Sequence, residues 1–341
     1  MFKLLDIYWS GLELGWWEWL GVLMATHYVS LFLAILPFYA AALLALAFSP
    51  YWWLLAGYLA WWLWDAETPS KGGRPVPAIR QASVWRAFAD YFPLRLHKTA
   101  HLSPHRNYLF CYHPHGLVAA GMFLNFATEA TGFSQAYPGL RSVPCTLEGQ
   151  FWPLPLRREY ILALGAVSVS RRSLGFLLAQ SGGQAVVLAV GGARETLETR
   201  RGHRQHRLLL RKRTGFVKLA LKHGTPLVPV YTFGEAALYD QRPNPHGSRL
   251  RGFQEAFKKL TGFPTPIFRG RGLFNTCYGY LPFRQPLNTV VGPPLEVEKV
   301  AEPTVKDVQQ LHASYVQALH SLFDEHKLQF GLTAEDTLVI C

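Results

Sequence analysis

Charge is missing from a long stretch near the start of the chain. Between Glu18 and Asp65 no Asp, Glu, Lys or Arg occurs, and His27 is the only ionisable side chain there apart from tyrosines. Soluble helices of this length rarely lack a charged face, so the stretch predicts a segment in lipid, with a buried soluble helix pair as the alternative. A crossing takes about 20 apolar residues, which allows two crossings or one re-entrant hairpin.

Cysteine is scarce, and several familiar motifs are missing. The four cysteines lie far apart, without a C-x-x-C pair, so neither a disulfide framework nor a zinc site is indicated. No N-x-S/T sequon occurs, which agrees with a domain that faces the cytosol. Dinucleotide, P-loop and G-x-S-x-G signatures are also absent, and the chemistries that depend on them lose their usual support.

Positive charge exceeds negative charge in the rest of the chain. The 341 residues include 34 Lys and Arg against 22 Asp and Glu, which gives a net charge of +12. Half of the residues are hydrophobic, which excludes a disordered chain. The expected partners are anions: phospholipid headgroups, a phosphorylated cofactor or nucleic acid. Net charge alone does not choose among them.

The uncharged stretch divides into two apolar pieces, residues 29–48 and 51–64. Pro50 lacks a backbone donor and biases Ser49 away from helical angles, so a turn is predicted there, with Pro37 as the competing break. Tryptophans cluster at both ends of the stretch, which is typical of the headgroup layer. Basic residues follow the second piece and place both flanks on the cytosolic side; they are Lys71, Arg74, Arg80 and Arg86.

Short apolar runs then alternate with helical patterns, which predicts an α/β fold. Four runs are interpreted as strands covered on both faces, because they lack alternation; they are residues 108–112, 160–169, 184–190 and 227–233. Residues 215–223 and 305–323 are predicted helices, and Thr304 with Asp307 makes a capping box for the second. That helix is expected to pack on the sheet and is assigned no chemistry. The predicted division is residues 1–66 for the N-terminal segment and membrane hairpin, and residues 67–341 for the domain outside the membrane.

The first candidate site is His113-Pro114-His115-Gly116, directly after a predicted strand. Pro114 fixes one backbone angle and Gly116 permits a close approach, so the turn can aim an imidazole into a cleft. An imidazole titrates near neutral pH and can take the proton of an alcohol during acyl transfer. The alternative is a turn with two exposed histidines, and a metal site lacks a third ligand at a suitable spacing.

The second candidate is Gly191-Gly192-Ala193-Arg194-Glu195, after the strand that ends at Val190. Glycines in a strand-to-helix turn expose backbone N–H groups, which can hold a phosphate or the oxyanion of a tetrahedral intermediate. Glu195 would then orient and stabilise a histidine. The alternative is a tight turn with a solvated glutamate.

The third candidate is the run from Arg200 to Arg213, in which seven of fourteen residues are Arg or Lys. Arg offers bidentate contacts to phosphate, so the run would attract the phosphates of coenzyme A or an anionic membrane surface. A solvated face and nucleic-acid binding are the alternatives. No pattern of stacking aromatics accompanies the run, which argues against nucleic acid.

Taken together, these segments resemble the type-two diacylglycerol acyltransferase family, which also contains the monoacylglycerol and wax-alcohol acyltransferases. The similarity runs in order along nearly the whole chain and is closest to the monoacylglycerol branch. Its motifs include Tyr91-Phe92-Pro93, His113-Pro114-His115-Gly116, Arg158-Glu159-Tyr160-Ile161, Val190-Gly191-Gly192-Ala193, Gly215-Phe216-Val217-Lys218, Leu227-Val228-Pro229-Val230 and Gly234-Glu235. Ala236 and Thr214 depart from the Asn and Lys that many members have.

The resemblance implies an α/β sheet with flanking helices, preceded by a transmembrane or re-entrant helical hairpin in the endoplasmic reticulum membrane. It implies an enzyme whose catalytic domain is cytosolic, with the lipid droplet as a second location. The enzyme would esterify monoacylglycerol or diacylglycerol with acyl-CoA as co-substrate in triacylglycerol synthesis, without a metal, another cofactor or nucleic acid. Oligomeric state is left open. Wax-ester synthesis and a non-catalytic lipid-droplet protein are the alternatives.

The resemblance also implies roles for the site residues. His115 is the expected base and His113 a supporting group, because plant members replace the first histidine and keep the second. Ala120 stands where related acyltransferases of the His-x4-Asp type have a carboxylate, so Glu195 is the expected partner of the base and Glu235 the reserve. The acyl-CoA side is assigned to Gly116, Gly191, Gly192, Arg211, Lys212 and Arg213.

Overall fold

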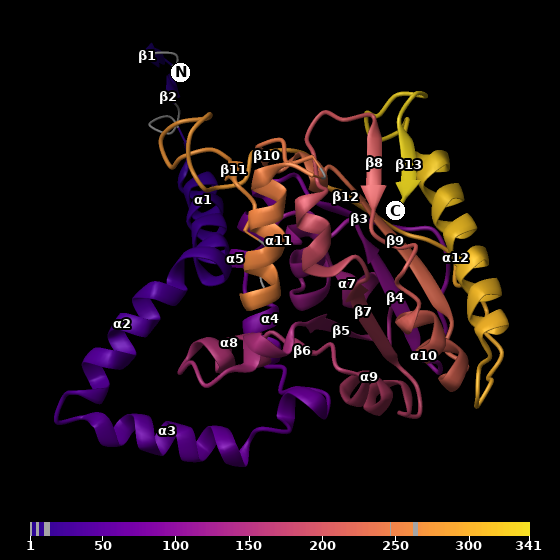
Figure 1. Ribbon diagram of the computed structural model, residues 1–341, viewed down its shortest axis with the longest axis horizontal. Helices are drawn as coiled ribbons and strands as arrows, with labels where there is room; N and C mark the ends of the chain where they lie inside the picture. Colours follow the sequence, from indigo (N-terminus) through magenta and orange to yellow (C-terminus); the bar gives the residue numbers. More distant parts are fainter. Residues whose placement is uncertain (1, 5–6, 10–13, 246, 262–264) are drawn as a thin grey trace.

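A mixed sheet forms the centre of the computed structural model, which describes residues 2–4, 7–9, 14–245, 247–261 and 265–341 (Figure 1). Within these residues the sheet has seven strands. Neighbouring strands run parallel, except that β12 runs antiparallel to β9. In spatial order they are β3 (Arg95–Lys98), β12 (Asn288–Val291), β9 (Leu227–Phe233), β4 (Tyr108–His113), β7 (Gln184–Ala189), β5 (Arg141–Thr146) and β6 (Val167–Ser168).

Helices cover both faces of this sheet. Leu109 and Cys111 of β4 pack in one core with α9 (Arg171–Leu178), α10 (Gly215–His223) and α12 (Val305–His326). Phe110 and Tyr112 point to the other face, toward α6 (Ala120–Met122), the π-helical η3 (Phe123–Ala127) and α7 (Phe133–Ala136). Every residue of β4 and of β9 is buried. For the predicted strands 108–112 and 227–233, the expectation of burial on both faces is confirmed.

The C-terminal helix α12 also agrees with its prediction. The Thr304 hydroxyl accepts a hydrogen bond from the Asp307 N–H, and the Asp307 carboxylate accepts one from the Thr304 N–H. This reciprocal pair satisfies donors that the first helical turn leaves free. Tyr315 and Leu319 are fully buried in the core beside β9. The helix therefore packs on the sheet as expected.

Smaller elements surround the sheet. Two further pairs of strands are β8 (Gln205–Leu208) parallel to β13 (Thr337–Ile340), and β10 (Asp240–Gln241) antiparallel to β11 (Phe268–Arg269). A third pair is β1 (Phe2–Leu4) with β2 (Ile7–Trp9). The helices around the sheet that follow the N-terminal region also include η2 (Thr68–Ser70), α4 (Pro77–Arg80), α5 (Val84–Tyr91), η4 (Glu148–Phe151), α8 (Arg157–Ala163), η5 (Gly192–Leu197), η6 (Glu235–Ala237) and α11 (Arg249–Thr261).

The apolar N-terminal region forms a bent helical hairpin. Helix α1 (Trp16–Val29) packs on α5 and continues through the π-helical η1 (Ser30–Ala34) into α2 (Ile35–Ala47). Helix α3 (Trp52–Trp64) follows after a break at residues 48–51, so the predicted turn at Ser49-Pro50 is confirmed. Figure 1 shows α2 and α3 projecting away from the sheet. Large apolar side chains of both helices remain uncovered: Phe38 on α2 is 74% exposed and Trp64 on α3 is 77% exposed.

By length and composition, no single helix in the described residues is long and apolar enough to cross a membrane. The segments Phe38–Ala47 and Trp52–Ser70 pass the same test as a pair, with a bend of 114° between them. This geometry is that of a broken span or a re-entrant loop.

A buried ion cluster anchors the end of α3. The fully buried guanidinium of Arg158 donates to a carboxylate oxygen of Asp65 at 2.8 Å and to the Asp65 carbonyl at 2.8 Å. Arg74 donates to the other oxygen of that carboxylate at 2.8 Å, and Glu159 contacts both arginines. Removing one partner of such a pair would leave a buried charge, so these residues fix the hairpin to the domain.

One predicted strand is wrong. Residues 160–169 contain the end of α8 and only the short strand β6, separated by Gly165, which has a φ of +82°. The N–H of Gly165 donates a hydrogen bond to the Leu162 carbonyl, and the N–H of Ala166 donates one to the Ile161 carbonyl. This is the hydrogen-bond pattern of a helix that ends at a glycine. The end of α8 was predicted as a strand because its apolar residues form a nearly unbroken run, and such a run does not distinguish a buried helix from a strand.

Candidate active site

Three of the sequence candidates meet at one edge of the sheet. Strands β4, β7 and β9 are parallel neighbours, so their carboxyl ends lie at the same edge, where ligands bind in open α/β sheets. The turn His113–Gly116 follows β4, Glu195 follows β7, and Glu235 follows β9. Both glutamates are almost completely buried. The turn therefore lies between two buried carboxyl groups that come from the two adjacent strands.

Glu195 holds the main chain of the turn. Its Oε2 accepts a hydrogen bond from the backbone N–H of His115 at 2.7 Å, and its Oε1 accepts one from the N–H of Leu209 at 2.9 Å. A Cβ on Gly191 would lie 2.3 Å from the carboxyl carbon of Glu195, so only glycine fits there. The sequence led us to expect Glu195 to orient the imidazole. In the described residues it contacts His115 through the backbone.

Glu235 holds the following segment in the same way. Its two carboxyl oxygens accept hydrogen bonds from the N–H groups of Ala120 and Gly121, each at 2.9 Å. The Tyr112 hydroxyl donates to Oε2 at 3.0 Å. Gly116 has a φ of +61°, and a Cβ there would lie 2.8 Å from Cγ of Glu235. The reserve carboxylate of the sequence prediction thus clamps the segment after the turn, and Tyr112 is a partner that the sequence did not identify.

His115 is half-buried as a residue, and its Nδ1 lies 3.2 Å from the Gly116 carbonyl oxygen. A carbonyl oxygen only accepts, so this contact places the proton on Nδ1 and leaves a lone pair on Nε2. Burial lowers the pKa of His115 below its ordinary value, despite hydrogen bonds to the backbone that act in the opposite direction. The imidazole is therefore neutral at neutral pH and can accept a proton.

His113 has a different environment. It is fully buried, and burial lowers its pKa to about 3, so the ring is neutral. Its Nε2 lies 2.9 Å from the hydroxyl of Tyr315 on α12. Because no part of His113 is exposed, it supports the turn from inside. The sequence missed Tyr315, although a buried tyrosine on an apolar helix stripe generally needs a partner for its hydroxyl.

The two clamping carboxyl groups titrate near neutral pH. Burial raises the pKa of Glu195 to about 7, opposed by the backbone hydrogen bonds from His115 and Leu209. Burial likewise raises the pKa of Glu235 to about 7, opposed first by the N–H of Gly121. In the part of the chain that the structure describes, no three His, Cys, Asp or Glu side chains form a metal-binding group.

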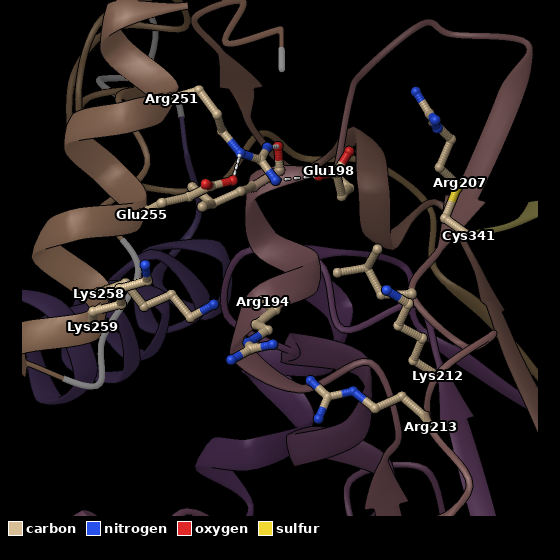
Figure 2. Close-up of a pocket in the computed structure, with 12 residues that line it drawn as sticks. Arg194, Glu198, Arg207, Lys212, Arg213, Arg251, Glu255, Lys258, Lys259 and Cys341 are labelled. Atoms are coloured by element: carbon tan, nitrogen blue, oxygen red, sulfur yellow. Dashed lines mark hydrogen bonds and ion pairs between the residues drawn. The ribbon is translucent and has the colours of Figure 1, made fainter. Parts of the chain in front are cut away.

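A basic pocket of about 600 Å³ lies beside the turn after β7. Seven Lys or Arg side chains line it, together with Glu198 and Glu255, both of which pair with Arg251. Figure 2 shows that these cations come from η5, from β8 and the segment after it, and from α11. They are Arg194, Arg207, Lys212, Arg213, Arg251, Lys258 and Lys259. Of the three cations assigned from the sequence, Lys212 and Arg213 line the pocket, whereas Arg211 donates to the Ile340 carbonyl instead.

The pocket is connected directly to the turn. Arg213 donates to the Gly191 carbonyl at 3.0 Å, and Leu209, which also lines the pocket, donates its N–H to Glu195. Burial lowers the pKa of Lys258, and Arg194 and Arg213 lower it further. Such crowding of like charges is relieved when an anion binds between them. The arrangement therefore offers an anion site that is connected, through Leu209 and Glu195, to the backbone of the residue that carries the neutral imidazole.

Comparison with known proteins identifies the family. The model of the diacylglycerol acyltransferase family matches residues 44–341, and the chain belongs to this family. The resemblance that the sequence motifs predicted is confirmed. No solved structure matches the chain significantly.

Named relatives align over most of their own length. Human 2-acylglycerol O-acyltransferase 3 is 46% identical over 92% of this chain and 92% of the relative. Diacylglycerol O-acyltransferase 2 of Danio rerio is 43% identical over 94% of this chain and 89% of the relative. Bovine 2-acylglycerol O-acyltransferase 1 is 41% identical over 92% and 93%, respectively.

Proposed function

We propose that the protein is an acyl-CoA-dependent O-acyltransferase that esterifies a free hydroxyl of monoacylglycerol or diacylglycerol. The observation that carries this proposal is the family match, which extends over both the histidine turn and the basic pocket. The relatives are named for the esterification of 2-acylglycerol and of diacylglycerol. The exposed apolar hairpin suits an enzyme whose acceptor is dissolved in a membrane.

The basic pocket is the proposed site for the phosphates of acyl-CoA. Its volume of about 600 Å³ is within the usual range for a small-molecule site, and its cations outnumber its carboxylates. Arginine forks match phosphate oxygens in pairs, while lysine ammonium groups act as point charges. With the phosphates near Lys212 and Arg213, the pantetheine arm would extend past Gly191 toward His115.

In the proposed reaction, Nε2 of His115 takes the proton from the acceptor hydroxyl while that oxygen attacks the thioester carbonyl carbon. A C–O bond forms, the C–S bond breaks, and the thiolate of coenzyme A takes the proton back from the imidazolium. No acyl-enzyme is formed. Backbone N–H groups of Gly116, Gly191 and Gly192 are the proposed donors to the oxyanion. General base catalysis of this kind contributes about 10²–10⁴-fold.

We also propose that α2 and α3 lie in the endoplasmic reticulum membrane, with the catalytic domain on the cytosolic face. The support is the exposure of large apolar side chains on both helices and the 114° bend between them. Basic residues after α3, including Lys71 and Arg74, agree with a cytosolic flank. A neutral acceptor would then reach the domain from within the bilayer.

The test uses the purified full chain in nanodiscs, a radiolabelled long-chain acyl-CoA, and a panel of acceptors. The panel contains monoacylglycerol, diacylglycerol and a long-chain alcohol. We expect label in an acylglycerol ester. Label only in wax ester would replace the proposed acceptor class, and lipid binding without any ester product would overturn the enzyme assignment.

A further inference from the structure

The loop of residues 147–156 presents large apolar side chains to the outside. It follows β5, at the same edge of the sheet as the histidine turn. Leu147, Trp152 and Leu156 are 39%, 60% and 79% exposed, and residues 151–156 read FWPLPL, without an ionisable group. Exposed apolar residues gathered in this way mark a surface that contacts another apolar phase.

The backbone at Leu156 has a left-handed conformation. Its φ is +64°, a conformation that residues with a bulky side chain rarely adopt. Strained residues persist when the surrounding structure holds them, and they cluster where a surface has a function. Since most of the Leu156 side chain is uncovered, packing within the chain does not explain why an apolar residue occupies this position.

The same loop is attached to both arms of the hairpin. The indole N–H of Trp62 on α3 donates to the Phe151 carbonyl at 3.0 Å. On the other side, the buried Arg157 donates to the carbonyl of Leu31, in the turn of π-helix before α2, and to the Gln150 carbonyl. Figure 1 shows α8 and the loop that precedes it inside the angle between α2 and α3. These hydrogen bonds therefore hold the loop and the start of α8 against α3 on one side and against η1 on the other.

We propose that the loop contributes a third membrane-embedded element: its uncharged tip, residues 151–156, enters the bilayer between the two arms of the hairpin. This inference rests on the proposed membrane position of α2 and α3. The tip contacts lipid and not protein, because it is uncharged and because tryptophan, here Trp152, favours the boundary between headgroups and acyl chains. A second copy of the chain or another protein would instead shield the tip from lipid.

The position of the loop in the membrane determines where the acylglycerol acceptor enters the domain. Helix α8 begins directly after the loop, and Leu164, just after the end of α8, packs in the same apolar cluster as Leu117, two residues after His115. Phe151 of the loop packs with Ile161 and Leu162 of α8, so α8 lies between the loop and the apolar cluster beside the histidine turn. A membrane-dissolved acylglycerol would enter the catalytic edge beside the loop.

The first experiment measures lipid contact in the full chain in nanodiscs that contain spin-labelled phospholipid. A fluorophore is attached to a single cysteine placed at Trp152, at Trp53 on the hairpin, or at Leu328 after α12, in a background without the native cysteines. Trp53 and Leu328 are both exposed. We expect quenching at 152 and 53 and none at 328. Quenching at 53 without quenching at 152 overturns the loop proposal alone, whereas no quenching at 53 removes the hairpin placement and the loop proposal together.

The second experiment tests the use of the loop in the reaction. For the double variant Trp152→Ser, Leu156→Ser, the KM for acylglycerol presented in vesicles should rise roughly ten-fold, equivalent to about 1.4 kcal/mol. The KM for acyl-CoA and the rate with a short-chain, water-soluble acylglycerol should not change. Leu328→Ser is the matched control for an exposed apolar residue. An unchanged KM for the vesicle substrate would contradict the proposal, and a wild-type chain without ester product would instead refute the proposed function.

Discussion

The hydroxyl of Tyr315 lies 2.9 Å from Nε2 of His113, which connects the C-terminal helix α12 to the first residue of the histidine turn. The same hydroxyl lies 3.4 Å from the Cys111 carbonyl, two residues earlier on β4. Both side chains are fully buried. A helix more than 180 residues farther along the chain therefore fixes the inner end of the turn whose outer histidine is the proposed base.

Tyr315→Phe should weaken this support. The change leaves a ring nitrogen of His113 buried without its partner, which costs about 1–3 kcal/mol. We expect a lower thermal midpoint and a lower kcat, with an unchanged KM for acyl-CoA, because the basic pocket is not altered. Tyr51→Phe is the matched control, since Tyr51 is exposed in the turn of the hairpin. Wild-type kcat and midpoint in Tyr315→Phe would contradict a supporting role for this pair.

Adjacent cations should differ in their effect on the acyl-CoA substrate. Lys212 lines the basic pocket and Arg211 does not, although both follow β8. Lys212→Gln should raise the KM for acyl-CoA by about ten-fold, because a hydrogen bond to a charged group contributes about 1.5–3 kcal/mol. Arg211→Gln should leave this KM near the wild-type value, and neither variant should change the KM for the acceptor. Equal effects of the two variants would show a general charge effect and no specific site.

The pH dependence of activity should report the lowered pKa of His115. The unprotonated imidazole is the base, and burial lowers its pKa from 6.5. Activity should therefore persist below pH 6.5 and be lost as the pH falls through the lowered pKa. The measurement is kcat against pH with saturating acyl-CoA and acceptor. An acid limb at or above pH 6.5 would contradict a buried, neutral base.

The two clamping glutamates should make stability decrease as pH rises. Each carboxyl has an ordinary pKa of 4.5 and a folded-state pKa of about 7, so the folded chain binds more protons than the unfolded chain between these values. Stability is then highest below about pH 4.5 with respect to these groups and falls until about pH 7. The thermal midpoint of the purified protein, measured across this range, should follow that slope.

Glu195→Gln provides the control for this slope, because an amide does not titrate. The variant should lose part of the pH dependence, and it should also be less active, since the amide N–H₂ group cannot accept the hydrogen bond from His115 or from Leu209. A slope that is the same in Glu195→Gln and in wild type would contradict the raised pKa of Glu195.

The elements that the sequence predicted well are those with unbroken apolar runs between turn residues. Strands β4, β7 and β9 and the two pieces of the hairpin have this character, whereas helices α10 and α12 were predicted from the helical spacing of their apolar residues. Strand β5 was missed because it begins with Arg141 and contains Pro144, which argues against a strand in a single sequence. Helix α8 was mistaken for a strand because its apolar residues do not show a helical period.

The candidate site was predicted in pieces, and its assembly was not. The sequence singled out the histidine turn, the segment of Glu195 and the basic run, but the order of strands that brings them together is a property of the whole sheet. The contact between Glu195 and the main chain of His115 was also out of reach, because it depends on the close approach at Gly191. Tyr315 and Tyr112 supply hydroxyl groups whose partners lie far away in sequence.

The role of His115 as the base is tested by the esterification activity of His115→Ala in microsomes, measured with labelled acyl-CoA and acylglycerol at matched protein levels. His105→Ala is the control, since His105 is exposed and remote from the turn in the described fold. We expect His115→Ala to lose the roughly 10²–10⁴-fold contribution of a general base and His105→Ala to retain wild-type activity. Wild-type activity in His115→Ala would contradict the assignment of the base.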